Sequence, residues 1–143
     1  MRRRNFVRDE RGAAMVEFAI VLPVLVVLVL AIIDFGRLLF LYNNLANAVR
    51  EGARFAAVQQ PDPCTTTAKG LATARVQNYI ATFGGTAASG SYTVTATCIG
   101  SPTQQVQLTV SGYPFQALTP LPFFSGVAIT ESAIFRWEGS ASP

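Results

Sequence analysis

The sequence predicts an α+β protein: a long N-terminal transmembrane helix and stem, followed by a small domain of one short helix and about three antiparallel strands. Three observations support this prediction. An uncharged apolar run extends from Phe18 to Ile33, an amphipathic helical pattern follows it, and alternating strand patterns occupy the second half of the chain. With 143 residues, the chain has room for one membrane helix and one small domain.

Residues 1–12 are predicted to form a basic arm in the cytoplasm. Their five arginines outweigh Asp9 and Glu10 and account for the whole formal charge of +3, because residues 13–143 balance to zero. Basic side chains before a membrane span favour a cytoplasmic N-terminus, so the rest of the chain would lie across the membrane. Since the outer part of the chain is not basic, we expect no nucleic-acid binding.

Residues 13–33 form the predicted transmembrane helix. Their length is close to the roughly 20 residues that cross the hydrocarbon of a bilayer. Pro23 removes one helical hydrogen bond and is expected to kink or loosen the helix. Glu17 is the unusual residue in this run, because a carboxylate at the centre of a membrane helix costs about 3 kcal/mol or more.

Residues 34–58 continue as an amphipathic helical stem. Its apolar positions recur every three or four residues, and we expect them to be buried against the domain's own sheet and, nearer the membrane, against partner subunits. They are Phe35, Leu38, Tyr42, Leu45, Val49, Gly52 and Ala56. Small residues in the second half of the stem let other elements approach closely, and Pro61 and Pro63 end the helix.

Residues 59–143 form the predicted extracytoplasmic domain. We expect a short helix over 67–83, a hairpin of strands over 91–99 and 104–113, and a last strand over 127–138. The proline-rich segment 114–126 is predicted to be an irregular loop. Glu131 interrupts the apolar alternation of the last strand, which leaves open which face of that strand is buried.

Cys64 and Cys98 both lie in this outer domain. A cysteine pair in an exported domain suggests a disulfide, and two separate buried thiols are the alternative. A disulfide between them would stabilise the fold by roughly 3–4 kcal/mol on the chain-entropy model.

The composition argues against an enzyme. The chain has no histidine, which removes the commonest general base and the commonest metal ligand. The other candidate groups are Asp62, Lys69, Glu131, Glu138 and many hydroxyls, and no nucleophile motif surrounds any serine. The two cysteines lack metal-ligand spacing. We therefore expect no catalysis, no cofactor and no metal.

Three simple interpretations of residues 1–33 compete. A cleaved secretory signal needs a small-residue cleavage site after the apolar core, and none follows. A twin-arginine signal is suggested by "RRNFVR" (Arg3–Arg8), but the strongly apolar core disfavours it. A plain single-span anchor for an extracytoplasmic interaction domain accounts for everything except Glu17 and the boundary at Gly12.

A fourth interpretation starts from "RGAAMVE" (Arg11–Glu17), which resembles the class III leader of type IV pilin-like proteins. In that family a prepilin peptidase cuts after a glycine on the cytoplasmic side, and the apolar stretch stays as a permanent anchor. The fifth residue of the mature chain is a glutamate. The resemblance implies cleavage between Gly12 and Ala13, with Glu17 as the fifth mature residue.

More specifically, the stretch from Arg11 to Val58 resembles the N-terminal signature of TadE-like pseudopilins of tight-adherence pilus systems. The matching motifs are the RGxxxVEFAxxLP opening, FGR at the membrane exit and REGARxAA at the end of the stem. The resemblance implies a minor pilin with a pilin-like outer domain, anchored by a single pass in the cytoplasmic (inner) membrane. Its implied partners are the membrane, the prepilin peptidase, and other pilins and pseudopilins.

Cleavage would give Glu17 a partner. The new α-amino group on Ala13 would be cationic at neutral pH. Glu17 lies one helical turn away on the same face, so it is positioned to pair with that amine in its own chain or in a neighbouring subunit. A paired buried carboxylate costs far less than an unpaired one. On this hypothesis Glu17 serves assembly, and Gly12 gives the peptidase access to the backbone.

Overall fold

The computed structural model describes residues 10–59, 62–83, 91–100, 105–119 and 126–137. Its elements in chain order are α1 (Glu10–Ala57), α2 (Thr66–Phe83), β1 (Thr93–Ile99), β2 (Gln105–Pro114) and β3 (Ala128–Arg136). The three strands form one antiparallel sheet in the order β1-β2-β3. The predicted α+β class is therefore confirmed, and the predicted element bounds differ from the observed ones by a few residues.

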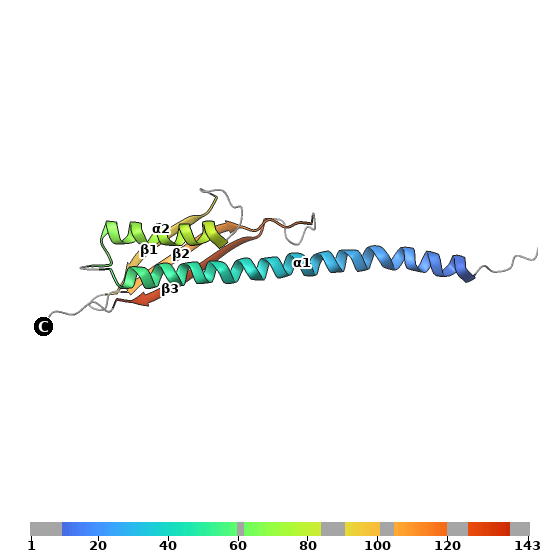
Figure 1. Ribbon diagram of the computed structural model, residues 1–143, viewed down its shortest axis with the longest axis horizontal. Coiled ribbons are helices and arrows are strands. Elements are labelled where there is room, and N and C mark those ends of the chain that lie inside the picture. The colour runs from blue at the N-terminus through green and yellow to red at the C-terminus, as the bar shows by residue number, and fades with distance from the viewer. Residues whose placement is uncertain (1–9, 60–61, 84–90, 101–104, 120–125, 138–143) are drawn as a thin grey trace, which may run out of the picture.

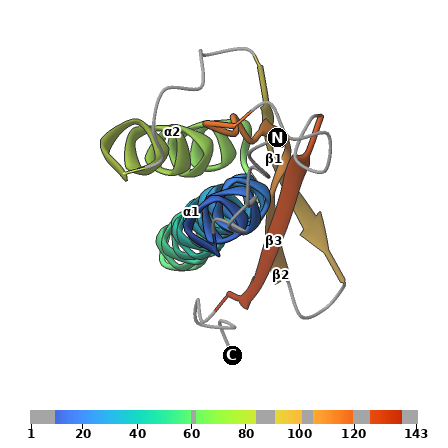
Figure 2. The same ribbon diagram turned by 90° about the vertical axis from the view of Figure 1, so that its right-hand side faces the viewer.

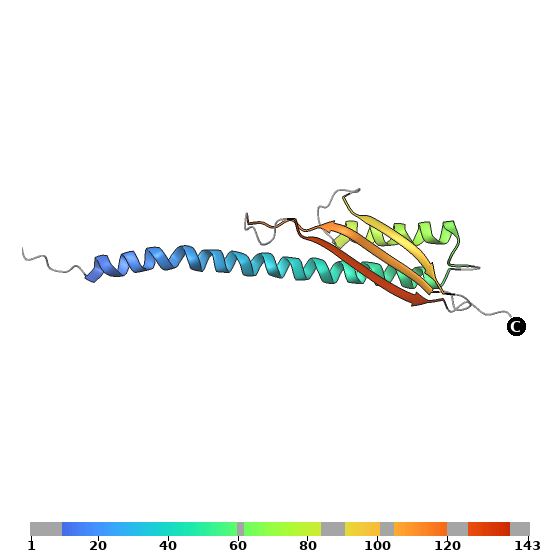
Figure 3. The ribbon, with the colours of Figure 1, turned by 180° about the vertical axis from the view of Figure 1, so that it is seen from behind.

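α1 runs almost the whole length of the described molecule, and the other elements pack only along its second half (Figure 1). Seen along α1, the two helices lie side by side on one face of the sheet (Figure 2). The strands run obliquely along α1, and their other face is open among the described elements (Figure 3). α1 contacts β2 and β3, while α2 contacts β1.

The first half of α1 is one apolar cylinder. The helix is continuous through Pro23, and its most apolar window has a mean hydropathy of 3.1 and is wholly exposed. Among the described residues, α1 alone is long and apolar enough to cross a membrane. The helix begins at Glu10, so the end of the predicted basic arm is helical; residues 1–9 lie outside the described residues.

The core of the outer domain lies where α1, α2 and the sheet meet. Small side chains on α1 let α2 pack closely, α2 contributes residues four apart on one face, and β2 contributes alternating ones. The cluster consists of Leu45, Ala48, Val49, Ala53, Ala56, Ala72, Val76, Ile80, Val106, Leu108, Val110, Tyr113 and Ile129. The packing is tightest at Gly52. A Cβ atom there would overlap the side chain of Val76 and would lie 2.9 Å from Leu108 Cδ2.

β2 contains a bulge that changes which side chains face the core. The register of its pairing with β3 shifts between Val110 and Tyr113, and Gly112 in this gap has a φ of 74°. Strict alternation from Val110 would point Gly112 inward and Tyr113 outward. The bulge instead buries Tyr113, whose ring lies 5.1 Å from that of Tyr92.

β3 turns its Ile129, Glu131 and Ala133 side toward α1, which answers the question that Glu131 left open in the sequence. Ile129 is buried in the core cluster, and Ala133 packs against it. The hydroxyl of Tyr42 on α1 donates a hydrogen bond to Glu131. The nearby Glu131 carboxylate raises the pKa of Tyr42 above its ordinary value.

The predicted apolar stripe of the stem is buried only in its second half. Leu45, Val49, Gly52 and Ala56 are buried, and Leu38 is half-buried. Phe35 and Tyr42, which lie nearer the membrane, are 54% and 48% exposed, so the chain's own sheet does not bury them. Burial of these two against partner subunits stays a prediction.

Candidate functional site

The predicted processing residues lie together at the start of α1. Gly12, Ala13 and Glu17 are all helical and exposed. Glu17 follows Ala13 by four residues, so their side chains lie one turn apart on the same helix face. In this uncleaved chain the nitrogen of Ala13 belongs to a peptide bond, so a charged partner for Glu17 at this position requires cleavage.

The span itself has no packing partner in the described part of the chain. Residues 13–30 are all exposed, and Ala31 is the first half-buried position. A helix that is apolar all round belongs in a membrane or in the interior of an assembly. The first half of α1 therefore has the surface of an anchor.

Asp34 is the residue that sequence analysis missed. It directly follows the predicted span, and it is fully buried. Its carboxylate accepts hydrogen bonds from the backbone N–H of Leu118 at 2.9 Å and of Thr119 at 3.1 Å, and from the Thr119 hydroxyl. Arg37 adds an ion pair at 3.3 Å. Asp34 lies on the same helix face as Leu38 and Leu45, and this position on the apolar stripe could have indicated that it is buried.

The donors to Asp34 come from a segment that we call the strap, Phe115–Thr119. It leaves β2 and runs back along α1 toward the membrane half (Figure 1). Phe115 is buried, its N–H donates to the carbonyl of Val127 at 2.9 Å, and its ring lies 5.9 Å from the guanidinium carbon of Arg37. The proline-rich segment that the sequence predicted as an irregular loop therefore begins with an ordered connection; residues 120–125 lie outside the described residues.

Hydrogen bonding sets the protonation state of Asp34. The Thr119 hydroxyl, and after it the Leu118 N–H, hold the pKa of Asp34 below its ordinary value of 3.8, although burial acts in the opposite direction. The carboxylate is thus ionised at neutral pH. It satisfies N–H groups that the strap presents to α1, and this ties the outer domain to the end of the span.

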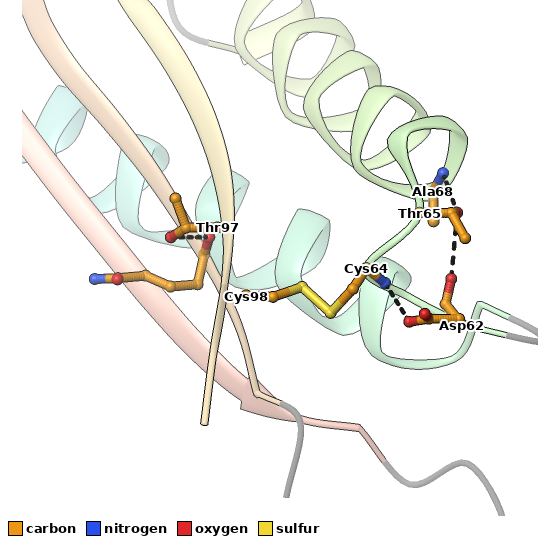
Figure 4. Close-up of a disulfide and its surroundings, with 7 residues drawn as sticks. Asp62, Cys64, Thr65, Ala68, Thr97 and Cys98 are labelled. Atoms are coloured by element: carbon orange, nitrogen blue, oxygen red, sulfur yellow. Dashed lines mark hydrogen bonds between the residues drawn. A yellow bond between two sulfur atoms is a disulfide. The ribbon is translucent and has the colours of Figure 1, made fainter. Parts of the chain in front are cut away.

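Cys64 and Cys98 form a disulfide, with their Cα atoms 5.9 Å apart. It joins the segment after α1 to β1 (Figure 4). Asp62 accepts a hydrogen bond from the Cys64 N–H at 2.7 Å, and the Thr65 hydroxyl accepts one from the Ala68 N–H at 3.1 Å. Thr65 thereby caps the N-terminus of α2, so local bonds and the disulfide together fix the turn between the helices.

The residues considered as candidate enzyme groups have structural partners or lie apart from any built site. Glu131 accepts a hydrogen bond from the Tyr42 hydroxyl, and Asp62 accepts one from the Cys64 N–H in the turn between the helices. Lys69 lies in the first turn of α2, and Glu138 lies outside the described residues. Within the described ranges, no three His, Cys, Asp or Glu side chains gather as metal ligands would.

A long exposed apolar helix with a compact α+β domain at its far end defines a membrane-anchored protein of pilin-like arrangement. Residues 12–54 match the family model described as TadE-like protein, so this part of the chain is TadE-like, as the resemblance predicted. The match covers the span and most of the stem, less than a third of the chain, and the family is a structural rather than an enzymatic one. No curated protein and no solved structure matches the chain.

Proposed function

We propose that the protein is a pseudopilin, or minor pilin: a membrane-anchored structural component for assembly of a tight-adherence type IV pilus. One observation carries this proposal. The family match begins at Gly12 and runs along a helix whose membrane half is left uncovered by the rest of the chain, with Glu17 on its second turn. A subunit that must pack its helix against others needs such a surface.

The proposed topology places residues 1–12 in the cytoplasm and the domain of residues 59–143 outside the cytoplasmic (inner) membrane. The arginine-rich arm favours this orientation. The disulfide supports it, because disulfides persist in oxidising compartments and are rare in the cytosol. The proposed partners are the prepilin peptidase and other pilins and pseudopilins.

Proposed processing cuts the bond between Gly12 and Ala13. Because α1 begins at Glu10, this bond lies in the first helical turns, which must open before a peptidase can bind the backbone. Gly12 lowers the cost of opening, since glycine is about 1 kcal/mol less favourable than alanine in a helix. The absence of a side chain on Gly12 also lets the enzyme approach closely.

N-terminal sequencing of the protein from membranes tests processing directly. The mature chain should begin at Ala13, and it should begin at residue 1 in a host that lacks its prepilin peptidase. Gly12→Val should block cleavage, because a branched side chain obstructs the bond. Gly36→Val is the matched control: it changes an exposed glycine of the same helix, with no atom within 4 Å of the new Cβ, and should be processed normally.

Assembly is tested at Glu17. Glu17→Leu makes the span more apolar, so the protein should insert at least as well but should fail to co-purify with pilus components. Glu17→Asp shortens the reach to the Ala13 amine by one methylene and should give a partial defect. Normal assembly by Glu17→Leu, together with retention of residues 1–12 in the wild type, would leave a plain membrane-anchored interaction domain as the better description.

A further inference from the structure

An apolar collar surrounds α1 at the base of the outer domain. Three of its members are on α1: Phe35, Leu39 and Phe40 are 54%, 47% and 65% exposed. The fourth is Leu118 on the strap, which is 70% exposed. Exposed apolar groups that gather in this way mark a surface that meets something other than water.

The collar is not a stripe. At 100° per residue, Phe35 and Leu39 lie on one side of α1 and Phe40 lies about 100° further round. The strap covers the remaining side, because Leu118 and Thr119 bind Asp34 there. A single partner helix covers one side of a helix, whereas a membrane surface surrounds it on all sides.

We infer that this collar lies in the lipid headgroup region, so that the outer domain stands directly on the membrane. Ile32 and Ile33, the last exposed apolar residues of the span, come directly before Asp34, and Phe35 directly follows it. Phe35 and Leu39 follow Ile33 by two and six residues, or about 3 and 9 Å along the helix. The headgroup layer is roughly 5–7 Å thick on each side of the hydrocarbon, and aromatic side chains are enriched there. Phe35 therefore lies within this layer, and the backbone of Leu39 lies just beyond it with its side chain tilted back toward the span.

The strap fixes the depth of the collar. The Leu118 N–H lies 2.9 Å from Asp34, so Leu118 is held at the level of the first residue after the predicted span. The Arg37 side chain is 44% exposed, pairs with Asp34 and lies between Phe35 and Leu39 in height along α1. Arginine readily places its charged head among lipid phosphates while its stem lies on apolar surface.

This inference rests on the membrane anchoring in the proposed function but not on processing or pilus assembly. It is tested with the full chain in two sets of phosphatidylcholine vesicles, whose acyl chains carry bromine either near the carbonyl end (the shallow label) or near the methyl end (the deep label). Bromine quenches tryptophan fluorescence at short range. The single native tryptophan, Trp137, is replaced by Trp137→Phe. Leu39→Trp and Leu118→Trp then report on the collar one at a time.

Two further positions serve as controls. Leu25→Trp reports on the span. Val58→Trp reports on an apolar position directly after the far end of α1, which is 66% exposed and so matches the collar in exposure. We expect loss of most of the emission at Leu25→Trp with the deep label, a clear loss with the shallow label and a blue-shifted maximum at both collar positions, and no loss with either label at Val58→Trp. An intact Cys64–Cys98 disulfide in each variant verifies the fold.

The outcomes separate the two proposals. Collar tryptophans that are quenched no more than Val58→Trp, while Leu25→Trp is quenched, would overturn the inference and leave the anchor in place. Emission at the collar that shifts with protein-to-lipid ratio but not with brominated lipid would assign the collar to a second copy of the chain, and would also overturn it. An unquenched Leu25→Trp would overturn both proposals.

Discussion

Thr119 donates two hydrogen bonds to Asp34, one from its backbone N–H at 3.1 Å and one from its hydroxyl. The two residues are 85 positions apart in the sequence, so this contact joins the end of the membrane span to the connection between β2 and β3. The outer domain is therefore bound to α1 in two regions: at the far end of the helix, and next to the membrane span.

Asp34→Ala should detach the strap from α1. The substitution leaves the N–H groups of Leu118 and Thr119 without their acceptor, and an unsatisfied buried donor destabilises more than a lost bond between exposed groups. In detergent, the melting temperature of the outer domain should fall, and amide hydrogen exchange at Leu118 and Thr119 should speed up. Arg37→Ala is the control, because that side chain is 44% exposed and its loss should have a smaller effect on both measurements.

The stabilisation from Asp34 should depend on pH. Its pKa in the folded protein lies below the ordinary value of 3.8, so the ionised form stabilises the fold at all pH values above the ordinary pKa. This contribution is lost as pH falls through the folded-state pKa. The difference in unfolding stability between wild type and Asp34→Asn should therefore be constant near neutral pH and shrink below 3.8. A difference that grows on acidification would contradict the assignment.

Gly52→Ala should destabilise the outer domain by roughly 1–3 kcal/mol, the usual cost of overpacking a filled core. The added Cβ would overlap Val76 and would lie 3.3 Å from the backbone oxygen of Ala72. Gly70→Ala on α2 is the matched control, since it meets no atom within 4 Å and should be neutral or slightly stabilising. Denaturant unfolding in detergent measures both, and equal effects at the two glycines would show that the α1–α2 contact is loose.

Replacing both cysteines, as Cys64→Ser with Cys98→Ser, should reduce the stability of the outer domain by roughly 3–4 kcal/mol. The bond closes a loop across 34 positions of sequence, and the native turn at Asp62 keeps its own hydrogen bonds without it. The fold should therefore persist with a lower melting temperature. Mass spectrometry without reduction should show the cross-linked peptide pair in the wild type from its native host, and free thiols there would contradict the pairing.

Periodicity was enough to predict the elements of this fold. The three- and four-residue spacing of Leu45, Val49, Gly52 and Ala56 locates the face that the domain covers, because burial of that stripe is what stabilises the stem. Strict alternation along β2 does not predict that Tyr113 is buried. A bulge at Gly112 reverses which side chains face the core, and no local sequence pattern predicts this bulge.

Polar contacts between residues far apart in the chain could not be predicted from the sequence. The sequence indicates only that Asp34 is the polar residue that ends the membrane span. The folded chain brings Leu118 and Thr119 to it. In the sequence, Glu131 likewise appears only to interrupt the apolar alternation of β3, and only the fold shows that Tyr42 is its partner. The proposed processing residues behave differently: Gly12, Ala13 and Glu17 are proposed from a local sequence motif, and the fold adds only that they are exposed.

The disulfide also determines how tension would travel through the chain. α2, residues 66–83, lies entirely inside the loop that Cys64 and Cys98 close. A pull between the membrane anchor and β3 therefore passes covalently from α1 across the sulfur–sulfur bond into β1, and α2 carries none of it. The second helix can then remain packed on Gly52 and its neighbours while the rest of the chain is under mechanical force.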